Sequence, residues 1–166
     1  WANSIYKDSK NRYWISSSVF LYRFDGKNLK SYAMELDNNK SLSGNLVFSV
    51  FEDKLHNIWI ISDGGIDKYN ETDDSFERLS AKNILPKNVK AIIEDNNNIL
   101  WISSGSRLAN FNPKTNTVKW ISQDDGLPKN DFIQKASYKL KNGSLLFHSI
   151  SKAKVPVEKR FTWSIS

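Results

Sequence analysis

The side chains that could do chemistry in this chain are few and scattered. The two histidines, His56 and His148, have no partner at metal-ligand spacing, and the chain contains no cysteine. No Ser-His-Asp set with a local catalytic signature occurs, and no glycine-rich phosphate loop is present. We therefore predict no metal site, no cofactor and no catalytic residue.

Two pairs of adjacent acids, Asp73-Asp74 and Asp124-Asp125, are the nearest approach to a catalytic constellation. Paired carboxyl groups hydrolyse glycosides when one of them is desolvated and both flank a cleft. Both pairs stand in predicted loops, where aspartate commonly forms turns. We interpret them as turn residues.

Four side chains are candidates for binding a ligand. Arg107 follows a Ser/Gly stretch, and its planar guanidinium suits a carboxylate or a sulfate group. Asp63 can accept hydrogen bonds from sugar hydroxyls. Trp120 breaks the apolar register of its strand, as a sugar-stacking platform would, and Lys129 stands in a nearby loop. The alternative interpretation is that Asp63 and Arg107 are solvated loop residues and that Trp120 covers an edge of the fold.

Composition and charge narrow the class of protein. The 166 residues suffice for one domain with a core, and 39% hydrophobic and 13% aromatic residues indicate a globular chain. No apolar run approaches the ~20 residues of a membrane helix, so no direct membrane contact is expected. The net charge of +6 favours an anionic partner, but no basic block or nucleic-acid motif occurs, and nucleic acid is set aside. The chain opens without a signal peptide, which fits a cytosolic protein or an excised piece of a larger one.

A repeat emerges when the tryptophans are aligned. An aspartate stands six residues before a Trp-Ile pair in three segments, with the tryptophans at Trp14, Trp59 and Trp101. A degraded fourth copy runs from Lys141 to Phe147. The aromatic markers stand 45, 42 and 46 residues apart. Ten residues after each tryptophan comes a second aromatic residue, in the order Phe24, Tyr69 and Phe111.

Each copy predicts four short strands without helical periodicity. In the second copy these are 46–52, 57–62, 65–69 and 75–80. Units of four strands that recur at ~40–50 residues are typical of β-propeller blades. We therefore predict an all-β propeller segment of about three and a half to four blades, part of a larger propeller, at about 1–33, 45–80, 88–122 and 131–150. Residues 151–166 form a divergent tail.

The repeated aromatic residues are interpreted as core. Neighbouring residues of a strand point to opposite faces, and both faces of a blade meet another blade. Trp14, Trp59 and Trp101, together with Phe24, Tyr69 and Phe111, are thus expected to pack between blades. The aspartate before each tryptophan repeats once per blade, which marks it as architectural.

The motifs resemble the two-component regulator propeller repeat. The resemblance rests on residues 43–53 (SGNLVFSVFED) with Ile58-Trp59-Ile60, and on 88–95 (NVKAIIED) with 100–103 (LWIS) and the trailing 111–113 (FNP). Residues 125–132 (DGLPKNDF), with Tyr138 and 142–147 (NGSLLF), are similar to the last blade of such propellers. The resemblance covers roughly residues 1–150.

This resemblance implies a function and a location. Such repeats form the periplasmic sensor region of hybrid histidine kinases of the Bacteroidetes type, so a sensory module for glycan-derived oligosaccharides is implied. The charge and Arg107 favour an anionic one. The loops between blades, and those between the second and third strands, carry Asp63, Arg107 and Lys129 and are the expected ligand face. The rival hypotheses are a carbohydrate-active lyase or hydrolase on a propeller scaffold and a protein-interaction or dimerisation module.

The sequence departs from the family pattern at three places. The usual glycine before the tryptophan is replaced by Asn11, His56 and Asn98. A glycine pair between the second and third strands survives only at Gly64-Gly65. After Ile150 the tail matches no other copy, and it reads either as a pair of strands (155–157 and 161–165) or as an artefact. Because blades stack in a ring, the remaining blades of a parent propeller or a second copy are the expected partners.

Overall fold

The computed structural model describes residues 2–80, 82, 84–127, 129–150 and 161–165. These residues form strands and one short 3-10 helix, η1 (Gln123–Asp125). None of the helical structure in the described ranges is long or apolar enough to cross a membrane. The chain divides into two compact units, Trp1–Lys87 and Asn88–Ser166, and each is described by itself.

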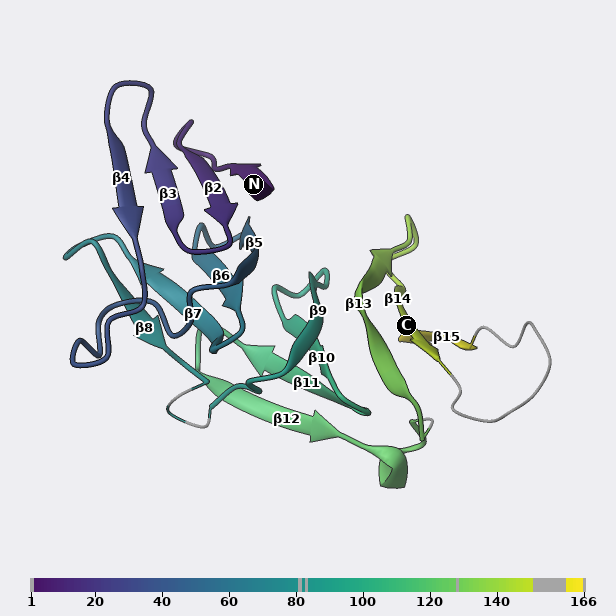
Figure 1. The fold of residues 1–166 in the computed structure, drawn as a ribbon. Coiled ribbons are helices and arrows are strands. Elements are labelled where there is room, and N and C mark those ends of the chain that lie inside the picture. Colours follow the sequence, from purple (N-terminus) through teal and green to yellow (C-terminus); the bar gives the residue numbers. More distant parts are fainter. Residues whose placement is uncertain (1, 81, 83, 128, 151–160, 166) are drawn as a thin grey trace. The chain divides into compact units, whose positions relative to one another are not determined.

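The first unit holds two antiparallel sheets of four strands, each in sequence order (Figure 1). The strands of the first sheet are β1 (Ala2–Lys7), β2 (Tyr13–Ser17), β3 (Leu21–Phe24) and β4 (Leu29–Tyr32). The strands of the second sheet are β5 (Val47–Glu52), β6 (Ile58–Ser62), β7 (Gly65–Asn70) and β8 (Ser75–Arg78).

The second unit holds the third and fourth sheets. The third sheet has four strands: β9 (Val89–Glu94), β10 (Leu100–Ser104), β11 (Arg107–Asn112) and β12 (Thr117–Ile121). The fourth has three described strands: β13 (Asp131–Lys139), β14 (Leu145–Ile150) and β15 (Phe161–Ile165). The expected all-β class with four-stranded antiparallel blades is confirmed. In the tail, the strand expected at 161–165 is β15, which pairs with β14, whereas residues 155–157 lie outside the described ranges.

The hairpin that opens each of the first three sheets has the same turn, set by one residue with positive φ. Asn11, His56 and Asn98 have φ angles of 62°, 64° and 62°. This left-handed region costs most residues energy, while asparagine tolerates it comparatively well. The three departures from the family glycine therefore keep the conformation that the glycine would supply.

The repeated aspartate joins this turn to the tryptophan. In the second sheet, Asp53 Oδ1 accepts hydrogen bonds from the backbone N–H groups of Leu55 and Asn57, both at 2.9 Å. Its Oδ2 accepts the indole N–H of Trp59 at 2.8 Å. Asp8 accepts the indole of Trp14 at 2.9 Å in the same way. Each aspartate thus satisfies both a tight turn and a buried indole, which explains the fixed six-residue spacing.

The third copy repeats this bond, between Asp95 and Trp101 at 3.0 Å. Trp14 and Trp59 are fully buried and Trp101 is 8% exposed. Of the second aromatic set, Tyr69 and Phe111 are buried, whereas Phe24 is only half-buried. Phe24 lies between Tyr13 and Leu29 on the first sheet, and both of these neighbours are exposed.

The alignment of the fourth copy was wrong by one residue. Its turn closes with Leu140 N–H donating to Ser144 O, the same five-residue pattern that Asp8, Asp53 and Asp95 begin in the other sheets. Leu140 therefore replaces the aspartate, and Leu146, not Phe147, replaces the tryptophan. Phe147 occupies the position of Ile60 and packs on the opposite face, against Trp101. The buried donor and its acceptor have been lost together, so no polar group is left unpaired.

Each unit has a core between its two sheets. In the first unit Trp14, Leu21 and Tyr32 of the first sheet pack on the second sheet. The Trp14 ring meets the Tyr69 ring edge-on at a centroid distance of 4.9 Å. In the second unit Trp101 and Leu108 pack with Phe132, Leu145 and Phe147 of the fourth sheet. In both units, the face of one sheet that carries the repeated tryptophan packs on the opposite kind of face of the next sheet. That second face carries the residue after the marker position, which is Ile60 in the second sheet and Phe147 in the fourth.

Candidate ligand-binding site

The four predicted ligand residues fall in both units. Asp63 lies in the turn between β6 and β7 of the first unit. Arg107, Trp120 and Lys129 lie in the second unit, at the start of β11, near the end of β12 and in the segment that leads to β13. Whether any of them binds a ligand remains a prediction.

Arg107 and Trp120 form a stacked pair. The two strands that carry them are hydrogen-bonded neighbours, with Leu108 opposite Ile121 and Ala109 opposite Trp120. The central guanidinium carbon of Arg107 lies 4.5 Å from the centre of the Trp120 ring. Arg107 is exposed and Trp120 is half-buried. The indole holds the guanidinium by a cation–π contact, and the N–H groups at the edge of the guanidinium can still bind an oxyanion.

The segment from β12 to β13 is fixed by hydrogen bonds near each of its ends. Asp125 Oδ2 accepts the backbone N–H of Ser122 at 2.9 Å, which fixes the short helix η1. At the far end, Phe132 N–H donates to Gly105 O at 2.8 Å, in the turn that precedes Arg107. The exposed Lys129 lies between these two fixed points. Asp125 thus acts as a turn residue, as expected.

Asp63 has a structural task in its turn. Its Oδ1 accepts the backbone N–H of Leu46 at 3.1 Å, while its own N–H donates to Leu46 O at 3.1 Å. The turn packs closely on the connection from the first sheet, since a Cβ at Gly64 would stand 2.1 Å from Ser43 O. The glycine at this position is therefore required by close backbone approach, and Asp63 ties the turn to the incoming chain.

Beneath this turn lies a buried carboxylate that the sequence interpretation missed. Asp67 is fully buried, and its Oδ2 accepts the backbone N–H of Ser43 at 2.8 Å and the Ser43 hydroxyl at 2.9 Å. Its Oδ1 has no hydrogen-bond partner in the described structure. Burial raises the pKa of Asp67 to about 6, although the Ser43 bonds and the charge of Arg78 oppose the rise. The only sequence signal was an acid in an expected core strand.

Arg78, the neighbour of Asp67 across the sheet, binds the same connection. Its guanidinium donates to four backbone carbonyls of residues 35–42, including Ser41 O from Nε at 2.8 Å and Leu42 O at 2.8 Å. Asp67 and Arg78 are opposite each other on β7 and β8. The connection between the first two sheets is therefore fixed by the buried acid Asp67 and the half-buried base Arg78.

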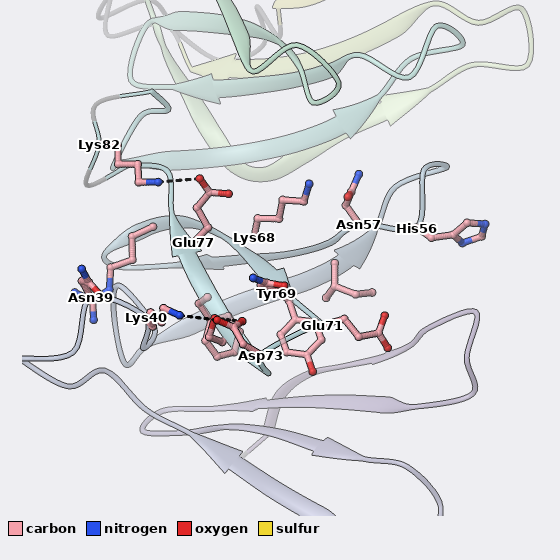
Figure 2. A pocket seen from close by; sticks show the side chains of 15 residues that line it. Asn39, Lys40, His56, Asn57, Lys68, Tyr69, Glu71, Asp73, Glu77 and Lys82 are labelled. Atoms are coloured by element: carbon pink, nitrogen blue, oxygen red, sulfur yellow. Dashed lines mark hydrogen bonds and ion pairs between the residues drawn. The ribbon is translucent and has the colours of Figure 1, made fainter.

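The first unit also has a polar pocket of about 820 Å³ around β6, β7 and β8 (Figure 2). Its acids and bases are largely paired, as in Lys82–Glu77 at 2.8 Å and Lys40–Asp73 at 2.7 Å. The Lys68 ammonium has no carboxylate partner among the described residues and lies 5.8 Å from the Trp59 ring centre. None of the four predicted residues lines this pocket. The sequence signal for this pocket was the run of polar residues along β7, β8 and the turn between them.

A serine, a histidine and an acid meet at the turns of the first two sheets, but not as a catalytic set. Ser9 Oγ lies 2.5 Å from Glu52 Oε1 and 3.2 Å from His56 Nδ1, and that same nitrogen lies 2.8 Å from Glu52 Oε1. In a nucleophilic triad the two ring nitrogens serve different partners, one the nucleophile and one the acid. This cluster instead ties neighbouring turns together. The described residues contain no group of three or more side chains suited to a metal.

Comparison with known proteins supports the assignment of the fold. No protein-family model and no curated protein sequence matches the chain. Among solved structures, a catalytically inactive virginiamycin B lyase from Staphylococcus aureus, crystallised with quinupristin, is similar at a TM-score of 0.61 and 14% identity. The match covers 97% of this chain and 54% of the lyase. At this identity the likeness shows the fold alone, and it supports the succession of propeller blades.

Two extracellular domains from B. thetaiotaomicron are also similar. That of the hybrid two component system BT4673 matches at a TM-score of 0.48 and 18% identity, over 99% of this chain and 31% of the domain. That of BT3049 matches at 0.46 and 19%, over 88% of this chain and 26% of the domain. The chain therefore spans less than a third of either domain.

Proposed function

We propose that this chain is a ligand-binding segment of the extracytoplasmic sensor propeller of a two-component signalling protein. The observation that carries the proposal is the order of sequence motifs, in which three blade repeats and a last-blade motif follow one another as in the two-component regulator propeller repeat. The blade structure of the sheets supports it. The location follows from the same resemblance and is periplasmic.

The proposed ligand is an oligosaccharide released from a glycan, with acidic sugars preferred. The preference rests on Arg107, whose guanidinium is exposed, stacked on Trp120 and without a carboxylate partner in the described structure. A guanidinium offers two parallel N–H groups to a carboxylate or sulfate, and the indole limits the conformational freedom lost on binding. Lys129 adds positive charge to the segment between β12 and β13 of the second unit.

The test is calorimetric titration of the full chain with neutral, carboxylated and sulfated oligosaccharides of equal length. For an acidic ligand that binds, Arg107→Ala should weaken binding by about 1–3 kcal/mol, the range for losing a charge-assisted hydrogen bond. Lys114→Ala, at the exposed β11–β12 turn, is the matched control and should leave the affinity unchanged.

The pocket of the first unit is the competing location. If Lys68→Ala weakens binding and Arg107→Ala does not, the ligand occupies that pocket, and the assignment to Arg107 is wrong. Sugar that is consumed during the titration would favour the enzyme hypothesis. Absence of binding across the panel would refute the proposed function of this segment.

A further inference from the structure

The first strand of every sheet carries a bulge at the same register position. On β5 the pairing with β6 shifts by one residue, which leaves Phe48 as the extra residue. The same shift leaves Asn3 extra on β1 and Lys90 extra on β9. A bulge of one residue is therefore a regular part of these first three sheets.

The bulge of the fourth sheet is longer. Phe132 pairs with Ser149 and Ser137 pairs with Phe147, so five steps along β13 stand against two along β14, and three residues are extra. Lys135 lies within this bulge and is exposed. Bulges re-aim side chains and are frequent next to functional sites. The three extra residues thus form a short projection that the other sheets do not have.

The backbone of Lys135 has a conformation that suits other residues better. Its φ angle is 58°, in the left-handed region that glycine and asparagine tolerate best. Most other described residues with positive φ are indeed glycine or asparagine. Lys135 forms no ion pair with a described residue. Strained positions of this kind cluster at ligand-binding sites, so a lysine where glycine would fit indicates a role for its ammonium group.

The bulge begins beside the turn that carries Arg107. Phe132 N–H donates to Gly105 O at 2.8 Å, and Phe132 packs in one core cluster with Ala91 of the third sheet. Arg107 follows Gly105 by two residues, and Lys135 follows Phe132 by three. Because a chain spans only ~3.5 Å per residue, one oligosaccharide can reach both cations.

Positive charge prevails around this hydrogen bond. Arg107, Lys129 and Lys135 are all exposed, and Asp131 is the one acid in the stretch 129–135. The planar guanidinium fits a single carboxylate or sulfate group through parallel N–H bonds. An ammonium group is a separate point charge on a flexible stem. The two kinds of cation therefore suit two different acidic groups of a ligand.

We propose that the β13 bulge presents Lys135 as a second anion-binding group beside Arg107, and that the ligand carries acidic groups on two neighbouring sugars. The inference rests on the proposed function, because it names the ligand class of the same site. Arg107 binds one carboxylate or sulfate group, and Lys135 binds the other.

Calorimetric titration of the full chain tests this with two oligosaccharides of equal length, one with a single sulfate and one with sulfates on two adjacent rings. In 0.15 M salt, which screens the general attraction of the net charge, the doubly sulfated sugar should bind at least tenfold tighter. Lys135→Gly should lower its affinity to that of the singly sulfated sugar. Lys141→Ala, at the exposed β13–β14 turn, is the charge control and should keep the tenfold difference.

The glycine variant also separates binding from folding. Glycine adopts a φ of 58° without strain, so Lys135→Gly should keep or raise the melting temperature while it loses the tenfold advantage. Asn116→Gly is the backbone control, since Asn116 has a φ of 55° in the β11–β12 turn, and it should leave both affinities unchanged.

The possible failures are distinguishable. Equal affinities of the two sugars, or a tenfold difference that survives Lys135→Gly, would overturn this inference and leave the proposed function intact. A lower melting temperature of Lys135→Gly would show that packing holds the lysine there, and would also overturn it. Absence of binding for both sugars would refute the proposed function, and this inference with it.

Discussion

The buried carboxylate of Asp67 should make the stability of the chain fall as the pH rises from about 4 to 6. Its pKa is about 6 in the folded protein against the usual aspartate value of 3.8. Because the folded state binds the proton more tightly than the unfolded state, the stabilising form is fully present below pH 3.8 and is lost through pH 6. One pKa unit corresponds to 1.36 kcal/mol, so the ionised group costs roughly 3 kcal/mol above pH 6.

Asp67→Asn isolates this contribution, because the amide keeps the shape and can still accept the Ser43 bonds. Urea unfolding followed by fluorescence at intervals between pH 4 and pH 7.5 should show the variant gaining about 3 kcal/mol relative to wild type across that range. Asp25→Asn is the contrasting control. Hydrogen bonds from the backbone N–H groups of Asn28 and Lys27 lower the pKa of Asp25 to about 2, so its contribution changes only below pH 4. Parallel stability curves for wild type and Asp67→Asn would refute the reasoning.

Three further predictions concern the blade turn and core. Trp59→Ala removes a fully buried indole and should cost about 3–5 kcal/mol in the free energy of unfolding, and a cost below 1 kcal/mol would contradict its core role. In a double-mutant cycle, Asp53→Ala should destabilise the Trp59 protein by about 1–2 kcal/mol more than the Trp59→Phe protein, and strict additivity would show that their bond contributes nothing. His56→Asn should raise the melting temperature slightly, because asparagine tolerates a φ of 64° better than histidine does; a fall would mean that the Glu52 contact matters more.

The fold could be predicted from the sequence because its strongest signal is local and repeated. The spacing from aspartate to tryptophan reflects one carboxylate that serves both a turn and an indole, as Asp53 does for Trp59. The six-residue spacing therefore recurs in the three copies that keep this hydrogen bond. The alignment of the fourth copy was wrong by one residue because Leu140 and Leu146 replace the aspartate and the tryptophan that mark the other copies. The aromatic residue that remains there, Phe147, lies on the other face of the sheet.

The candidate site was predicted less completely, because it depends on contacts between segments far apart in the sequence. Residue type alone singled out Arg107 and Trp120, but their stacking follows from the pairing of β11 with β12. Asp63 was chosen as a free acceptor, and the approach of Leu46 gives it a structural bond instead. Asp67 went unnoticed because only its long-range contact with Ser43 explains an acid in that strand.

The central claim, that this chain binds an acidic oligosaccharide without transforming it, is tested most directly by one calorimetric titration. The full chain is titrated with a carboxylated or sulfated oligosaccharide beside a neutral one of the same length. The account predicts saturable injection heats that return to baseline for the acidic sugar, and weaker binding of the neutral one. A sustained heat signal after each injection would indicate turnover. Either that signal or the absence of any binding heat would contradict the claim.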